Sequence, residues 1–440
     1  MRVVLISTYD LGRQPFGLAS PAAWLADAGF DVQCVDLSRQ SFESEHAEAG
    51  LVAFHLPMHT ATRLAVPVIT RIRRLNPAIE LCCYGLYAPL NEAFLRSIGV
   101  SHILGAEYEA DLVRLASGRS STSAVKELPR LAFVKPLRVS LPPLTQYATL
   151  QQGTSRRVVG YTEASRGCKH TCRHCPIVPV YGGQFRVVPP KVVAADVAAQ
   201  VAVGAEHITF GDPDFLNGVG HARRVIEAVA RQCPGLTYDV TIKVEHLLEH
   251  AEMLPELRDT GCLFVTSAVE SFDDLVLRRL EKGHTRSDVD RAVDVCRSVG
   301  IALVPTFVAF TPWTTRDAYC DFLSQIDRLK LVDYVAPIQL AIRLLVTAGS
   351  RLLGLDEIRS QVGAYDDTRL LYPWRHIDAS MDQLAEDIGA IVGRRLTAPR
   401  RSTFEEIWAC AHDDPRAVPL TRSASTQRIE VPYLNEPWYC

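Results

Sequence analysis

Hydrophobic and polar positions in the first 118 residues alternate between short apolar runs and longer stretches with a helical period. The apolar runs predict strands, at residues 2–8, 30–37, 50–56, 79–86 and 101–106. The helical stretches lie between them, at residues 21–29, 60–75 and 91–99. Buried strands alternating with helices indicate an α/β domain with a doubly wound parallel sheet, which binds ligands at the carboxyl ends of its strands. No G-x-G-x-x-G follows the first strand, so a dinucleotide fingerprint is absent.

The alternation stops at a small, polar and proline-bearing stretch, residues 119–155, which we interpret as a linker. It resumes over residues 156–345, where the pattern predicts six strands, at 157–165, 206–213, 237–244, 262–271, 301–310 and 333–342. Successive strand–helix units predict a partial (β/α)6 barrel with its chemistry in the loops after the strands. Residues 346–440 have a mainly helical pattern and then a polar tail.

Composition and charge exclude several classes of function. Lys and Arg number 47 against 50 Asp and Glu, so no net field favours nucleic acid or an anionic membrane surface. No apolar run reaches the roughly 20 residues that span a bilayer. The first residues have the pattern of a strand rather than of a signal peptide. Twelve cysteines without a secretory signal predict a reducing, cytoplasmic location.

Three cysteines lie within eight positions, Cys168, Cys172 and Cys175, in the loop after the first strand of the expected barrel. A structural zinc site would need a fourth ligand, for which His170 or His174 is available. A ferredoxin-like electron carrier would need a fourth nearby cysteine, and the next one is Cys233. The third interpretation is a [4Fe-4S] cluster with three protein ligands and one iron left open for substrate, which the loop position and the C-x3-C-x2-C spacing favour.

The same motif, preceded by Glu-Ala-Ser-Arg-Gly, resembles the radical S-adenosylmethionine (radical SAM) superfamily. The resemblance implies that Cys168, Cys172 and Cys175 bind the cluster and that SAM chelates the open iron through its amino and carboxylate groups. It also implies reductive cleavage of SAM, usually to a 5′-deoxyadenosyl radical. His174 takes a slot that the family usually fills with an aromatic residue, so we expect it to pack beside the cluster or the adenine.

Two further segments resemble the family's contacts with the methionine part of SAM. Residues 208–217 resemble the segment that meets the amino group, which places Gly211 and Asp212 there. The aspartates of this segment could instead close a turn or cap a helix. Lys243 is a cation among apolar neighbours and by resemblance could meet the SAM carboxylate, or it could be a lysine at a strand edge.

Two more segments resemble the contacts with the nucleoside. The whole stretch 266–285 is similar to the family pattern in which a carboxylate and a hydroxyl address the ribose, which implies this role for Glu270 and Ser271. Residues 301–310 occupy the position of the strand that contacts adenine but lack its common glycines, so the backbone of Val308 and Phe310 would make that contact.

The first domain resembles the cobalamin-binding domains that precede many radical SAM barrels, through residues 82–92 and 105–118. D-x-H-x-x-G, which would supply an axial histidine to cobalt, is absent. We expect core or surface roles for His55, His59 and His102. Cobalamin could bind without a protein ligand, or the domain could keep only the shape.

The last residues, "EPWYC", and residues 56–64, "LPMHTATRL", resemble a radical SAM family named for its tail, CUAEP or CCAEP, in which cysteine is followed by selenocysteine or cysteine and then Ala-Glu-Pro. We hypothesise that a UGA codon after Cys440 was read as a stop. Cys440 is then a tentative second reactive site, and the alternative is an ordinary, disordered terminal cysteine.

The sequence therefore predicts a radical SAM enzyme that starts radical chemistry on an unidentified small molecule or peptide. It implies a reductant such as a flavodoxin or a ferredoxin. Cobalamin-dependent methyl transfer is the alternative within this class. A zinc-stabilised binding module and an electron carrier are the alternatives outside it.

Overall fold

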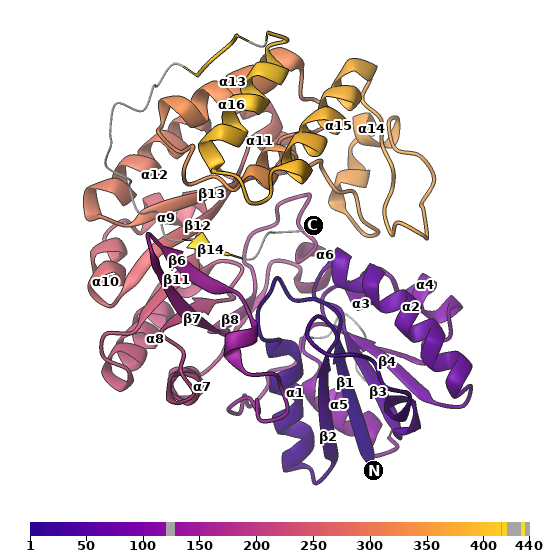
Figure 1. Ribbon diagram of the computed structural model, residues 1–440. Coiled ribbons are helices and arrows are strands. Elements are labelled where there is room, and N and C mark those ends of the chain that lie inside the picture. The colour runs from indigo at the N-terminus through magenta and orange to yellow at the C-terminus, as the bar shows by residue number, and fades with distance from the viewer. Residues whose placement is uncertain (120–127, 415, 420–432, 436–440) are drawn as a thin grey trace.

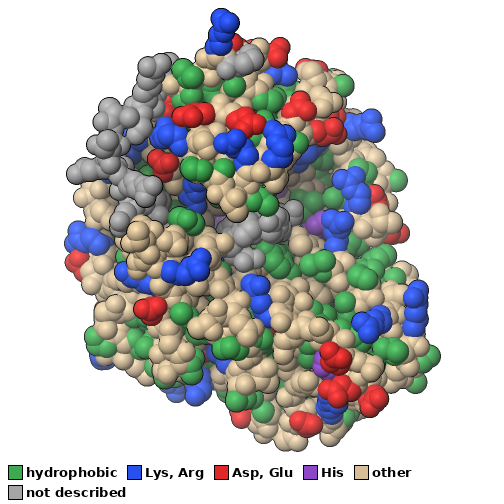
Figure 2. Space-filling model, viewed as in Figure 1, with side chains coloured by type: hydrophobic (Ala, Val, Ile, Leu, Met, Phe, Trp, Pro, Cys, Tyr) green, Lys and Arg blue, Asp and Glu red, His purple; other side chains and the backbone are tan. Residues whose placement is uncertain are grey.

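The computed structural model describes residues 1–119, 128–414, 416–419 and 433–435. In Figure 1 a first sheet lies at the lower right, a second sheet at the left, and the C-terminal helices along the top. Basic and acidic side chains are interspersed on the face drawn in Figure 2, in keeping with the near balance of charge. Among the described residues, no helix combines the length and the apolar character needed to cross a bilayer.

The first sheet is parallel, with the order β2-β1-β3-β4-β5. Its strands are β1 (Arg2–Ser7), β2 (Asp31–Asp36), β3 (Leu51–His55), β4 (Glu80–Tyr84) and β5 (His102–Ile103). Its helices are α1 (Phe16–Asp27), α2 (His59–Leu75), α3 (Tyr87–Leu90), α4 (Glu92–Ser97) and α5 (Glu109–Ala116), and a 3₁₀ turn spans Ser44–Glu48. All the strands expected from the apolar runs form, and the order reverses between β1 and β3, which makes that edge the switch point.

Local sequence explains how this layer is built. Helix α2 buries Ala61, Ala65, Ile69 and Ile72, which recur every three or four residues and so line one face. The helix ends at Leu75, and Asn76 takes an extended conformation, as a residue before proline prefers. Residues of α1 and α5 pack in the hydrophobic cluster on the other face of the sheet.

The second sheet has the order β13-β12-β11-β10-β7-β6-β14. Its parallel strands are β7 (Ser155–Thr162), β10 (His207–Phe210), β11 (Thr237–Thr241), β12 (Cys262–Glu270) and β13 (Ala302–Phe307). The helices that cover them are α7 (Pro190–Ala202), α8 (Val219–Gln232), α9 (Val244–Glu249), α10 (Met253–Asp259), α11 (Asp274–Leu280), α12 (Arg286–Val299) and α13 (Arg316–Arg328). The sheet curls into a half barrel, as the strand–helix alternation predicted.

Two features of this half barrel differ from the expectation. The predicted sixth strand, 333–342, is not a strand: Pro337–Leu340 form a 3₁₀ turn, and only an isolated bridge joins Phe310 to Arg343. Pro337 has no backbone N–H to give to a ladder, which disfavours a strand interior. The expected linker contributes a further strand, β6 (Thr149–Gln152), because Gly153 adopts a positive φ of 57° and turns the chain into β7. Strand β14 (Tyr433–Leu434) pairs with β6.

The remaining elements belong to the loop after β7, to the C-terminal region and to short turns. The cluster loop, residues 163–188, contains a short hairpin of β8 (Ser165–Gly167) with β9 (Phe185–Val187) and the helix α6 (Val178–Tyr181). The C-terminal helices are α14 (Asp356–Arg359), α15 (Ala379–Arg394) and α16 (Arg400–Ala411), and 3₁₀ turns span Leu144–Gln146, Phe215–Gly218 and Arg351–Gly354. Helices α15 and α16 form where the pattern predicted helices, and their apolar residues pack in the main core.

Candidate functional site

The three clustered cysteines lie on the cluster loop, directly after β8. Gly167 ends β8 with a φ of 77°, and a Cβ there would lie 2.4 Å from the Tyr181 ring, so only glycine fits. The N–H of Cys175 donates to the carbonyl of Cys172 over 3.2 Å, which folds the end of the motif into a turn. Asn217 accepts from the N–H of Lys169 at 3.2 Å and lies 3.7 Å from the Cys168 sulfur.

The donor set of Cys168, Cys172 and Cys175 fits an iron–sulfur cluster better than a single ion. Three thiolates on one zinc ion lie about 3.8 Å apart, because Zn–S bonds are about 2.3 Å long. Among the described residues, the metal-ligand groups that come within 4.8 Å of one another do not include this set of three sulfurs. Burial raises the pKa of Cys175 to about 12 and raises that of Cys168, so a metal must displace protons from these thiols.

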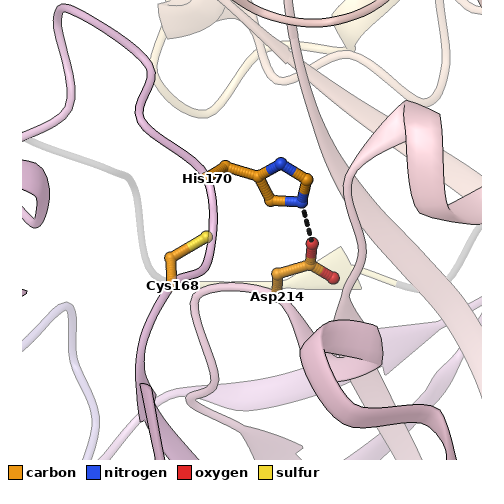
Figure 3. Close-up of side chains that lie close together, drawn as sticks. All are labelled: Cys168, His170 and Asp214. Carbon is orange, nitrogen blue, oxygen red and sulfur yellow. Dashed lines mark ion pairs between the residues drawn. The ribbon is translucent and has the colours of Figure 1, made fainter. Parts of the chain in front are cut away.

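His170 does approach Cys168, together with Asp214 (Figure 3). Its Nε2 lies 3.6 Å from a carboxylate oxygen of Asp214 and 3.2 Å from Nε2 of His246. Its Nδ1 lies 3.1 Å from the ammonium of Lys243. Because both ring nitrogens are engaged and a lysine is adjacent, His170 is poorly placed to complete a zinc site. We assign this network to the support of the cluster loop.

Glu270 is held by a lysine and a histidine. Nε2 of His174 and Nζ of Lys282 lie 3.1 and 3.3 Å from Oε1 of Glu270, and the side chains of all three are largely buried. Burial disfavours the charged carboxylate, but Lys282 and His174 outweigh it and lower the pKa of Glu270 to about 2. Glu270 also adopts a positive φ of 68° at a β-bulge where β12 ends.

Three of the residues expected to contact the nucleoside line one cavity of about 230 Å³: Glu270, Ser271 and Val308. The N–H of Val308 donates to the carbonyl of Glu270 over 2.9 Å, which joins the two strand ends. Phe310 lies deeper. Its N–H donates to Ile342, its carbonyl accepts from Leu344, and its ring stacks on Tyr319. Of Val308 and Phe310, only Val308 therefore lies beside the cavity.

The residues expected near the methionine part lie around the cluster loop. Asp212 is buried and accepts from the Ala164 N–H at 2.9 Å and the Ser165 hydroxyl at 2.5 Å, so its carboxylate braces the start of the loop. Burial raises the pKa of Asp212 to about 7. A Cβ on Gly211 would lie 1.7 Å from the Tyr161 hydroxyl, so close packing requires glycine there. Lys243 precedes α9, after β11 has ended, and pairs with Glu245 at 2.8 Å.

Sequence reasoning missed Lys282, His246 and the loop-supporting role of Asp214. Lys282 stands within the stretch 266–285, which resembles the superfamily, but its burial beside the cluster loop follows only from the fold. His246 carries no motif. Cys440 lies outside the described residues.

The first sheet presents its switch point to the cluster loop. Ser7 and His55 are register partners at the ends of β1 and β3, and both are buried. Ser7 Oγ and His55 Nδ1 have no hydrogen-bond partner among the described residues. The imidazole lies against Gly17, where a Cβ would be 2.1 Å from the ring. Burial first, and then the nearby Arg166, lower the pKa of His55 to about 3. Orphaned polar atoms at a switch point fit a domain that takes a polar ligand there.

The other two histidines of this domain have the structural roles expected for them. His59 is buried, and its Nε2 lies 2.6 Å from the carbonyl of Arg369. His102 pairs with Glu80 at the surface.

Arg166 connects this domain to the cluster loop. It lies on β8, two residues before Cys168, and forms a two-pronged pair with Glu109 at 2.7 and 3.1 Å. Its Nε donates to Glu163 at 2.8 Å, and a nitrogen lies 3.8 Å from Glu107. All of these side chains are buried or nearly so, and burial raises the pKa of Glu107 to about 7.

Comparison with known proteins identifies the half barrel. Residues 162–323 match the sequence model of the Radical SAM superfamily. The chain is 24% identical over 254 residues to tRNA-2-methylthio-N(6)-dimethylallyladenosine synthase of Halorhodospira halophila, covering 53% of each protein. It is 22% identical over 320 residues to hopanoid C-3 methylase of Methylococcus capsulatus, covering 68% of this chain and 62% of that protein. The chain thus spans about half the length of the tRNA-modifying relatives.

Solved structures share both sheets. The cobalamin-dependent radical SAM enzyme OxsB, with aqua-cobalamin and SAM bound, matches with a TM-score of 0.68 and 13% identity, covering 89% of this chain and 66% of that one. The radical SAM methyltransferase TsrM of Kitasatospora setae matches with a TM-score of 0.59 and 19% identity, covering 75% and 71%. At these identities the likeness is one of fold.

The match identifies residues 162–323 as a radical SAM domain, and the superfamily that this domain defines uses a [4Fe-4S] cluster and SAM. Its overall fold is that of the cobalamin-dependent members OxsB and TsrM: a doubly wound parallel sheet followed by a half barrel.

Proposed function

We propose that this chain is a radical SAM enzyme that cleaves SAM reductively and starts radical chemistry on a substrate still to be identified. The observation that carries the proposal is the arrangement at the barrel's carboxyl edge. A loop with three cysteines lies beside a cavity lined by Glu270, Ser271 and Val308, and His174 joins the loop to Glu270.

In this proposal Cys168, Cys172 and Cys175 bind the cluster. The cluster, once bound and reduced, supplies one electron to the sulfonium of SAM. His174 and Lys282 both contact Oε1 of Glu270, which leaves Oε2 for a ribose hydroxyl, and Ser271 lines the same cavity. Val308 would meet the adenine, and Lys243, beside the cluster loop, would meet the SAM carboxylate. Gly211 and Asp212 would act on the methionine amino group through backbone carbonyls, since the Asp212 carboxylate is already paired.

The decisive experiment uses protein purified without oxygen and reduced with dithionite, an artificial one-electron donor. Incubated with SAM, it is expected to release 5′-deoxyadenosine and methionine, identified by mass spectrometry. Methylthioadenosine would indicate cleavage of a different carbon–sulfur bond. A colourless protein with one zinc and no sulfide would support the binding module. A cluster that is reduced reversibly without SAM cleavage would support the electron carrier.

We also propose that the first domain takes a corrinoid and that the reaction is a methyl transfer. The orphaned Ser7 Oγ and His55 Nδ1 at the switch point favour this second candidate. Among the relatives, hopanoid C-3 methylase is a methyl-transferring protein by name, and the OxsB structure holds aqua-cobalamin. A corrinoid on this edge would lie near Arg166, and hence near the cluster loop.

This second candidate predicts that hydroxocobalamin comigrates with the protein in gel filtration. His55→Phe removes the orphaned Nδ1, and we expect it to weaken binding about tenfold, the effect of one lost hydrogen bond of about 1.4 kcal/mol. His102→Phe is the matched control, because His102 pairs with Glu80 at the surface. Equal affinity in both variants, or no retention by the unaltered chain, would contradict the corrinoid proposal.

The ending "EPWYC" leads us to propose membership of the family with a CUAEP or CCAEP tail, with Cys440 as a second thiol site. An in-frame UGA directly after the Cys440 codon supports this, and UAA or UAG rules out the selenocysteine continuation. We further propose a cytoplasmic enzyme that receives its electron from a flavodoxin or a ferredoxin.

A further inference from the structure

The end of α11 and the residue that follows it are hydrogen-bonded to the cluster loop. The N–H of Arg173 donates to the carbonyl of Leu280 at 2.9 Å, and its guanidinium donates to the carbonyl of Arg279 at 2.9 Å. The same guanidinium pairs with Glu281 at 2.7 Å. Since Arg173 stands between Cys172 and Cys175, these contacts fix the position of Lys282 relative to both cysteines.

Lys282 is a buried ammonium, with a side chain only 4% exposed. Burial opposes its charge, but Glu270 and the thiols of Cys172 and Cys175 raise the pKa of Lys282 above its ordinary value, so it stays a cation. Burial raises the pKa of Cys175, and Lys282 acts in the opposite direction. The ammonium lies 3.3 Å from Glu270 Oε1, and the same oxygen lies 3.1 Å from His174, the residue before Cys175, so Lys282 is held beside the cysteine loop.

The charge of Lys282 affects the reduction potential of a metal centre bound by the three cysteine sulfurs. Reduction adds one negative charge, and a fixed cation in a medium of low dielectric stabilises the more negative state. Reduction potentials of iron–sulfur clusters depend on the net charge and the solvent exposure of their surroundings. The nearby carboxylate of Glu270 acts with the opposite sign.

We propose that Lys282 is a positioning residue that, with Glu270 as its opposing charge, sets the reduction potential of the cluster at Cys168, Cys172 and Cys175. The inference rests on the proposed function, because it requires a [4Fe-4S] cluster in the loop. It goes further in giving the Glu270–Lys282 pair an electrostatic role toward the metal centre, separate from any contact with SAM.

The test is a redox titration of the anaerobically purified full chain without SAM, followed by electron paramagnetic resonance. We expect Lys282→Met to reduce the equilibrium constant for one-electron reduction about tenfold, a midpoint about 59 mV lower. Glu270→Gln is expected to raise the midpoint. The double variant, which removes one charge of each sign, is expected to fall between the two. Lys191→Met, an exposed lysine on α7, is the matched control and should keep the unaltered value.

These variants separate an electrostatic role from a purely structural one. A packing defect would shift the midpoint potentials of both single variants in the same direction, and that of the double variant further still. That result would overturn the proposal. An unchanged midpoint in Lys282→Met also overturns it. If Lys282→Met assembles no cluster, Lys282→Arg should keep the original midpoint and Glu270→Gln should still raise it. Iron and sulfide analysis of the unaltered chain tests the proposed function separately, because a chain without a cluster fails before any variant is compared.

Discussion

Replacing Cys172 with alanine is expected to abolish both the iron–sulfur cluster and SAM cleavage. Cys172 is the middle ligand of the loop and is 7% exposed, so no solvent-borne thiol can readily take its place. With two thiolates left, iron and sulfide per chain should fall to near zero and the visible absorbance of the cluster should vanish. 5′-Deoxyadenosine should fall below detection. The measurements are metal and sulfide analysis, absorbance, and product detection after reduction.

Cys233→Ala is the matched control for this prediction. Cys233 is also a buried cysteine, at 8% exposure, but it ends α8 away from the loop. Its removal should cost stability through lost packing while leaving the iron content unchanged. Full iron content in Cys172→Ala, or equal loss of iron in both variants, would contradict the assignment of the three-cysteine loop.

The periodic pattern of the chain predicted most of the fold. Apolar runs between helical stretches gave all the strands of the first sheet, and the parallel strands of the half barrel lie where the second set of runs placed them. The failure at 333–342 has a local cause. The run is apolar, but Pro337 removes a donor and the chain closes a 3₁₀ turn instead. Strand β6 was missed because its residues are mostly polar and its pairing depends on the turn at Gly153.

The candidate site could be predicted only where its residues lie close together in the sequence. The three cysteines lie within eight residues, so the cluster loop is visible in the sequence. Lys282 lies 107 residues after Cys175 and His246 lies 76 residues after His170, and only the curl of the sheet brings such pairs together. A local pattern tells which face a residue occupies but not which distant side chain it meets. The assigned roles of Glu270, Ser271 and the other SAM contacts remain predictions.

Replacing Arg166 with methionine is expected to have the second large effect, a loss of folding stability rather than of catalytic activity. Arg166 is the cation among Glu107, Glu109 and Glu163 at the junction of the two sheets, so Arg166→Met leaves these largely buried carboxylates without the cation that pairs with them. Breaking a buried ion pair on one side costs about 3–5 kcal/mol. We expect a loss of that size in the free energy of unfolding, measured by urea denaturation at pH 8, whereas Arg224→Met, an exposed arginine on α8, should lose less than about 0.5 kcal/mol.

The loss in Arg166→Met should shrink as the pH falls, because the orphaned carboxyls then take up protons. Burial already raises the folded pKa of Glu107 to about 7, above its ordinary 4.5, and losing the guanidinium can only raise it further. The folded chain therefore binds more protons than the unfolded chain between pH 4.5 and 7, so stability falls as the pH rises through that window. The destabilisation should be largest above pH 7 and clearly smaller at pH 5. Equal losses at pH 5 and pH 8 would mean that the variant fails through packing, including lost contact of the guanidinium with the Tyr108 and Phe133 rings, and not through unpaired charge.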